Sequence, residues 1–152
     1  MKMRKQAGFT LVELLIVVAI IGIIAAIAVP NLIKAVDRAK QKSTMADIRA
    51  LANAVEQYAI DINYYPLASS MSPVDGQAMV IEPHFIQKAP TRDGWRGPLY
   101  YGSNAAGSDY TVTSYGKDKK VSSTSAGPTS SFDCDIIFQN GSWVAYPDGL
   151  QT

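Results

Sequence analysis

The chain has one cysteine, Cys134, and one histidine, His84, among its 152 residues. A single cysteine cannot form a disulfide within the chain, so a domain outside the cytoplasm must be held together by packing or by a metal ion. His84 has no second histidine or cysteine pair near it, and we interpret it as a surface or loop residue. The sequence also lacks a nucleophile paired with a base and a phosphate-binding loop. We therefore do not expect an enzyme.

Charge is missing from one long stretch near the N-terminus. Residues 14–29 are all apolar or glycine, and between Phe9 and Val29 only Thr10 and Glu13 are polar. As an α-helix this segment would be about 30 Å long, the thickness of bilayer hydrocarbon. It is too long for the apolar region of an ordinary secretory signal peptide, and it lacks the small-residue cleavage site. The segment predicts a membrane-spanning helix.

Glu13 lies inside the edge of this apolar run. An ionised carboxylate costs about 2.5 to 3.5 kcal/mol on insertion scales if it lies near the bilayer centre, so it needs a partner. The simpler alternative is a plain membrane anchor whose glutamate reaches back to the interface.

The segment GFTLVE, residues 8–13, resembles the class III signal of type IV pilins and pseudopilins. The resemblance implies that a prepilin peptidase removes a leader of residues 1–8, cutting between Gly8 and Phe9, and methylates the new N-terminal phenylalanine. It further implies that Glu13 pairs with the N-terminal amine of a neighbouring subunit in a filament. The signal also implies a cytoplasmic head, which three basic residues before the span and four after it do not decide by themselves.

Pro30 falls where that family places its helix-kinking proline. It divides a filament-core helix, residues 9–30, from an amphipathic half of the same helix, residues 31–62. Because proline removes one backbone hydrogen bond, we expect a kink or local melting over residues 26–30. In the second half, apolar residues recur every three or four positions. This stripe consists of Ile48, Leu51, Val55, Tyr58 and Ile62.

The sequence NYYP, residues 63–66, ends the helix, because the residue before a proline avoids the α region. A connecting segment, residues 63–97, contains a possible short helix near residues 74–81. The C-terminal domain, residues 98–152, is expected to be a small antiparallel sheet with Asn140-Gly141 as a hairpin turn. The predicted strands are residues 98–103, 110–115, 136–139 and 142–146. The predicted fold class is α+β, the type IV pilin fold, with the sheet packed on the amphipathic half of the helix.

The C-terminal half resembles the major pseudopilin of type II secretion systems, through residues 90–100, 110–118 and 135–141. Trp95 is interpreted as a core anchor, and Arg96 stands where that family usually has glycine. The resemblance implies a structural calcium ion held by acidic side chains and backbone carbonyls. The candidate ligands are Asp118, Asp133 and Asp135, and the alternative is a flexible loop with solvated aspartates.

The resulting hypothesis is a structural filament subunit, the major pseudopilin of a type II secretion system as the resemblance implies. It is expected in the inner membrane with its C-terminal domain outside the cytoplasm, and after polymerising with other copies in a periplasmic pseudopilus or a cell-surface pilus. Its expected partners are prepilin peptidase, the inner-membrane assembly platform, minor pilins or pseudopilins, and membrane lipid before assembly. The alternatives are the major subunit of a surface type IV pilus and a membrane-anchored minor pilin that binds a ligand or DNA. A basic run follows the span at Lys34, Arg38, Lys40 and Lys42. We interpret this run as a solvated face or a lipid headgroup contact, and nucleic acid is not an expected partner.

Overall fold

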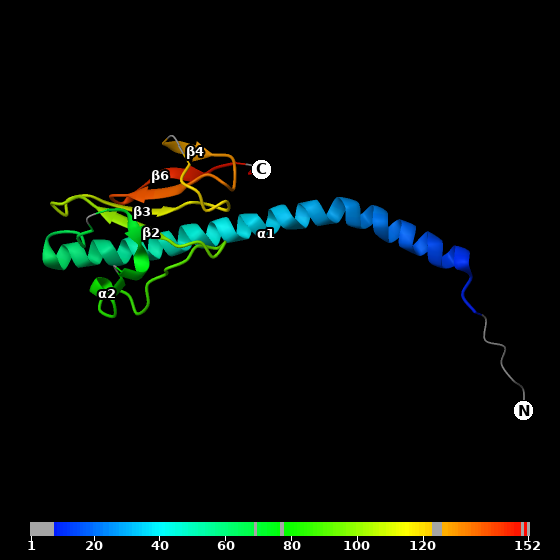
Figure 1. Cartoon of the computed structure of the whole chain (residues 1–152), viewed down its shortest axis with the longest axis horizontal. Coiled ribbons are helices and arrows are strands. Elements are labelled where there is room, and N and C mark those ends of the chain that lie inside the picture. The colour runs from blue at the N-terminus through cyan, green and yellow to red at the C-terminus, as the bar shows by residue number, and fades with distance from the viewer. Residues whose placement is uncertain (1–7, 69, 77, 123–125, 150, 152) are drawn as a thin grey trace, which may run out of the picture. The chain divides into compact units, whose positions relative to one another are not determined.

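The computed structural model describes residues 8–68, 70–76, 78–122, 126–149 and 151. The chain divides into two compact units, residues 1–35 and residues 36–152. Both contain part of one helix, α1, which runs over Leu11–Ile62. Figure 1 draws the chain and labels α1, α2, β2, β3, β4 and β6.

The two ends of α1 follow local chemistry. Thr10 precedes the first helical residue, and its side chain accepts a hydrogen bond from the backbone N–H of Glu13, as an N-cap residue does. At the other end Asn63 has φ of 67° and donates its N–H to the carbonyl of Ala59 at 2.8 Å. Asparagine tolerates this left-handed conformation, which closes a helix C-terminus. The predicted helix end at Ile62 is confirmed.

The expectation of local melting before Pro30 is wrong, because α1 is helical throughout residues 11–62. A proline costs the helix one N–H donor, while the turns on both sides keep theirs. The side-chain amide of Asn31 also donates to the carbonyl of Ile27 at 3.1 Å. A kink at this position stays a prediction.

The second unit contains a six-stranded sheet in the order β1-β2-β3-β5-β6-β4. The strands are β1 (Ser72–Pro73), β2 (Tyr100–Ser103), β3 (Tyr110–Ser114), β4 (Gly127–Thr129), β5 (Ile136–Gln139) and β6 (Ser142–Pro147). A short 3-10 turn, η1 (Val74–Gly76), and a short helix, α2 (Ala78–Ile81), precede β2. The α+β fold class is confirmed, and so are the four predicted strands, to within two residues at each end.

The sheet is mixed rather than antiparallel throughout. β4 lies in a stretch that we interpreted as a loop, and it pairs parallel with β6, matching Gly127 with Ala145. β1 was also missed, because two residues that include a proline carry no strand pattern. The β5–β6 hairpin turns at Asn140 and Gly141, with φ of 46° and 84°, as predicted.

The core of the second unit forms where the sheet meets α1 (Figure 1). Ile48, Leu51 and Val55 from the helix are at most 2% exposed, and they belong to one cluster with strand residues such as Tyr101, Val112 and Phe138. Tyr58 packs at the edge of this cluster, and Ile62 is 41% exposed. The predicted apolar stripe therefore contacts the sheet over its first three members.

Candidate processing and assembly site

Gly8, Phe9 and Glu13 lie together at the exposed start of the first unit. Glu13 Oε2 accepts hydrogen bonds from the backbone N–H of Thr10 at 2.8 Å and from the Thr10 hydroxyl at 2.7 Å. With the reciprocal bond to the Glu13 N–H, this is a capping box, which satisfies free donors in the first turn of a helix. Among the described residues, then, Thr10 is the hydrogen-bond partner of the Glu13 carboxylate. The predicted contact with the amine of a neighbouring subunit stays a prediction.

The helical segment that follows exposes its apolar side chains. Every large apolar residue from Phe9 to Val36 is at least 44% exposed, and Phe9 itself is 81% exposed. Among the described residues, α1 is the one helix long and apolar enough to cross a membrane, with mean hydropathy of 3.0 in an 18-residue window of which none is buried. Water cannot stabilise such a surface, so it requires lipid or other apolar helices around it.

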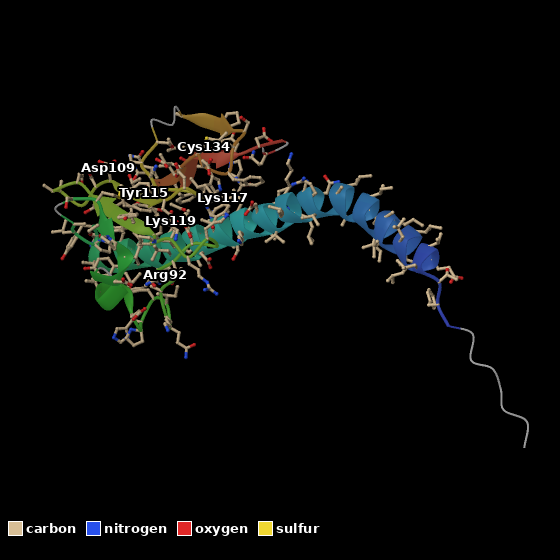
Figure 2. The ribbon with its side chains drawn as sticks, turned by 45° about the vertical axis from the view of Figure 1, so that its right-hand side comes forward. Arg92, Asp109, Tyr115, Lys117, Lys119 and Cys134 are labelled. Atoms are coloured by element: carbon tan, nitrogen blue, oxygen red, sulfur yellow. The ribbon has the colours of Figure 1, made fainter. Side chains whose placement is uncertain are left out.

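In the second unit a buried carboxylate interrupts the basic run of the helix. Asp37 is 5% exposed, and its Oδ2 accepts a hydrogen bond from Lys117 Nζ at 2.9 Å while its Oδ1 accepts one from Trp95 Nε1 at 3.1 Å. Lys40 Nζ lies 4.0 Å from the same carboxylate. Burial opposes ionisation, but the bonds from Lys117 and Trp95 outweigh it and hold the pKa of Asp37 below its ordinary value. Figure 2 labels Lys117 in the turn after β3.

Trp95 belongs to a tight turn that docks on α1. The backbone N–H of Gly94 donates to Thr44 Oγ1 at 2.9 Å, and a Cβ on Gly94 would lie 2.3 Å from the carbonyl oxygen of Lys40. Trp95 is only half-buried, so its role is the hydrogen bond to Asp37 more than the core anchor that we predicted.

The side chain of Asp93 stabilises the same turn. Its buried carboxylate accepts hydrogen bonds from the backbone N–H groups of Trp95 and Gly97 and from the hydroxyl of Ser114 in β3. Arg96 follows with φ of 63°, in the left-handed region that favours glycine. The position therefore has the backbone geometry that a glycine adopts most easily.

The three predicted calcium ligands lie near the turns on either side of β4. Asp135 is 3% exposed and accepts a hydrogen bond from the backbone N–H of Ser122 at 3.1 Å, whereas Asp118 and Asp133 are exposed. Burial raises the pKa of Asp135, hydrogen bonds from Ser122 oppose the rise, and the negative charge of Asp118 adds to it. In the described part of the chain, no group of three or more histidine, cysteine or acidic side chains could hold a metal ion. The structure thus places two of the carboxylates within electrostatic reach of each other without assembling a three-carboxylate cluster.

His84 is an exposed turn residue, as predicted, and Cys134 is a free, partly buried thiol.

Sequence reasoning missed two polar contacts of α1, those of Asp37 and Gln41. The side chain of Gln41 donates to Gln151, which in turn donates to the carbonyl of Thr129 in β4. Asp37 lies 58 and 80 positions from Trp95 and Lys117, and Gln41 lies 110 positions from Gln151, so no local pattern could reveal these contacts.

A family model described as type II secretion system protein G matches residues 31–128, and one described as the prokaryotic N-terminal methylation motif matches residues 3–29. The chain belongs to the type II secretion system protein G family. The methylation motif covers the same segment in which Gly8, Phe9 and Glu13 lie.

Curated relatives agree with the family assignment. The chain is 31% identical to the type II secretion system core protein G of Klebsiella pneumoniae over 134 residues, covering 83% of this chain and 87% of the relative. It is 33% identical to the protein of the same name from Pseudomonas aeruginosa, over 79% of this chain and 89% of the relative. The match to the Vibrio cholerae protein is 49% identical but spans only 43% of this chain and 44% of the relative.

Proposed function

We propose that this chain is the major pseudopilin of a type II secretion system, a structural subunit that polymerises through its N-terminal helix. The observation that carries the proposal is the continuous exposed apolar surface over residues 9–36, preceded by a methylation motif in a member of the protein G family. A surface of this kind is stable either in lipid or among sister helices. A subunit that moves from the inner membrane to a periplasmic fibre uses both environments in turn.

The processing step would occur between Gly8 and Phe9. Both residues are exposed, and the capped helix begins two residues after Phe9, at Leu11, so the bond between them lies outside the helix. Cleavage would create an amine four residues before Glu13. In a bundle of such helices the carboxylate of one subunit would exchange its Thr10 contact for the methylated amine of a neighbour.

An intact-mass spectrum of the protein from two fractions of the same cells, sheared surface filaments and the remaining membranes, tests this proposal. We expect a chain that begins at methylated Phe9 and stays with the membrane fraction. Abundant processed chain in the sheared filaments would identify the main subunit of a surface pilus instead. A membrane-bound chain that still carries residues 1–8 would contradict the whole pilin assignment.

The two alternatives draw less support. A surface pilus shares the helix and the methylation motif, but the family match favours secretion. A minor pilin that binds a ligand or DNA would not need Glu13, because such a module does not have to polymerise by itself.

We further propose that a calcium ion binds at the loop that holds Asp118, Asp133 and Asp135. The buried carboxylate of Asp135 beside the charge of Asp118 suits the site, because a cation would offset a repulsion that the fold leaves in place. Carbonyl oxygens of the same loop would supply the remaining ligands of the six to eight that calcium prefers. EDTA should lower the Tm of the protein and added calcium should restore it, and no response to either would refute calcium binding.

A further inference from the structure

We propose that the second unit carries a basic collar that binds the anionic headgroups of the membrane in which the chain waits before assembly. The collar consists of Arg38, Lys40, Lys42, Lys117, Lys119 and Lys120. It rests on the proposed function only in requiring that α1 spans a membrane.

The ion pair at Asp37 brings two separate basic segments together. Lys117 Nζ lies 2.9 Å from Asp37 Oδ2, so the turn after β3 contacts the helix within one turn of Arg38 and Lys40. Lys119 and Lys120 follow by two and three residues, which keeps them within about 11 Å of Lys117 along the chain. Figure 2 labels Lys117 and Lys119 in this turn. The sequence alone separates the two segments by 80 positions.

The collar keeps most of its charge available to a partner. Arg38, Lys42, Lys119 and Lys120 are exposed, and the side chains of Lys40 and Lys117 remain 42% and 47% exposed beside Asp37. Acidic groups close to these residues are Asp37, Asp118, Asp133 and, beside Asp118, Asp135. Six cations against four carboxylates leave the surface positive at neutral pH, and a positive surface fits an anionic partner.

The helical part of the collar follows the predicted membrane span closely in sequence. Lys34 is the first charged residue after Glu13, at the end of the apolar segment. Arg38 comes four residues after Lys34, and Lys117 contacts the helix beside it at Asp37. Each basic side chain near an anionic surface contributes about 1 kcal/mol to binding.

The test uses the full chain, inserted in vesicles of zwitterionic phosphatidylcholine or in vesicles where about a third of the lipid is anionic phosphatidylglycerol. EDTA is present, so that calcium cannot bridge aspartates to lipid. A membrane-impermeant acetylating reagent labels lysines, and mass spectrometry reads each site. We expect Lys117, Lys119 and Lys120 to react about threefold or more slowly in anionic vesicles, with the difference lost at high salt. Lys88, an exposed lysine in the segment between α2 and β2, should react equally in both.

The double variant Arg38→Gln/Lys42→Gln should reduce the protection of Lys117, Lys119 and Lys120, because it removes collar charge without touching the Asp37 contacts. The matched control Lys88→Gln should leave that protection unchanged. Equal labelling in the two lipids, or protection that survives the double variant, would overturn the proposal. Protection found only in assembled filaments would also overturn it and would assign the collar to a second copy of the chain. Failure of the chain to insert, measured by carbonate extraction, would contradict the proposed function instead.

Discussion

The two units of the chain treat apolar side chains in opposite ways. In the first, the large apolar side chains of α1 are exposed, whereas in the second, equally large residues such as Ile48, Leu51 and Phe138 are at most 1% exposed. The second unit satisfies its own apolar surface by packing α1 against the sheet, as a globular domain does. Within residues 8–35 of the first unit the large apolar side chains have no such cover, so the stability of this segment depends on what surrounds it. The second unit therefore folds by burying its own apolar side chains, whereas the first depends on association with lipid or with other apolar helices.

The polar residues of the two units differ in where their hydrogen-bond partners come from. In the second unit the buried carboxylate of Asp37 has partners from other parts of the chain, Lys117 and Trp95. In the first, the hydrogen bonds that the structure describes at the Glu13 carboxylate come from its own helix turn, through Thr10. A local cap of this kind can be exchanged for an intermolecular contact without unfolding anything. Variants that act on one unit alone should therefore separate association from folding.

The largest effect is expected from Glu13→Ala. Insertion should stay intact, because loss of a charge favours entry into the bilayer, but pelletable filaments should fall by about tenfold or more as the amine of a neighbour loses its partner. Immunoblots of the filament and carbonate-resistant membrane fractions measure both quantities. Thr10→Ala is the matched control: it removes the cap hydroxyl and leaves the carboxylate, so filaments should decrease far less. Normal filament yield from Glu13→Ala would contradict the assembly role.

Replacing a glycine by alanine should destabilise the second unit when the glycine is Gly94 and should not when it is Gly22. Gly94→Ala would place a Cβ 2.3 Å from the backbone carbonyl oxygen of Lys40, and the turn would have to move off α1. We expect a loss of about 2 to 4 kcal/mol in the free energy of unfolding of the second unit. Gly22→Ala has no atom within 4 Å of its new Cβ and should leave that stability unchanged. Thermal unfolding of the two full-length variants in detergent, followed by near-ultraviolet circular dichroism, compares them. Equal Tm values would refute the docking role of Gly94.

Sequence reasoning recovered those parts of the fold that depend on local chemistry. The helix end at Asn63, the Asn140-Gly141 hairpin and the apolar stripe at Ile48, Leu51 and Val55 all follow from backbone preferences or periodicity. Pro30 misled the prediction of local melting, because a proline removes one helical bond and the long helix around it retains the rest. β4 was missed because a three-residue strand of Gly-Pro-Thr, paired parallel with β6, looks like a loop in sequence.

The residues of the candidate site also differ in whether local sequence could reveal their roles. Gly8, Phe9 and Glu13 could be located because a contiguous motif carries them, and the structure places them in one exposed segment. In the sequence Asp37 is one acid among basic residues. Its structural role, the hydrogen bond with Lys117, depends on a tertiary contact. Distant polar pairs of this kind depend on how the sheet docks on the helix, which no short pattern encodes.

Asp37→Asn should weaken the second unit and change its response to acid. The folded pKa of Asp37 is lowered, so its contribution is fully present above the ordinary aspartate pKa of about 3.9 and is lost as the pH falls through the lowered value. At pH 7 we expect the variant Tm to be several degrees lower, and between about pH 4 and pH 2 the gap to the parent should narrow. Circular dichroism melts across this range test both statements. A gap that stays constant with pH would show that the ionisation of Asp37 does not stabilise the fold.

At pH 7, Asp135→Asn should affect stability in the direction opposite to Asp37→Asn. Burial and the charge of Asp118 raise the folded pKa of Asp135, so the native state holds the proton more tightly and the carboxylate costs stability as the pH rises through that value. In EDTA at pH 7 we expect the variant to be as stable as the parent or slightly more so, by on the order of 1 to 3 °C in Tm. Added calcium should then raise the Tm of the parent alone. A marked loss of stability in EDTA would mean that the charged form of Asp135 is itself required by the fold.

Arg96→Gly should produce the smallest change, a gain confined to the folded second unit. Arg96 holds φ of 63°, which costs a residue with a Cβ about 1 to 2 kcal/mol and a glycine almost nothing. Part of that relief is offset because glycine also makes the unfolded chain more flexible, so the net gain should be about 1 kcal/mol or less. Arg92→Gly, a second exposed arginine whose φ is not in the left-handed region, is the control and should lose stability. If both variants lose stability alike in urea unfolding of the full chain, the left-handed geometry at Arg96 carries no strain.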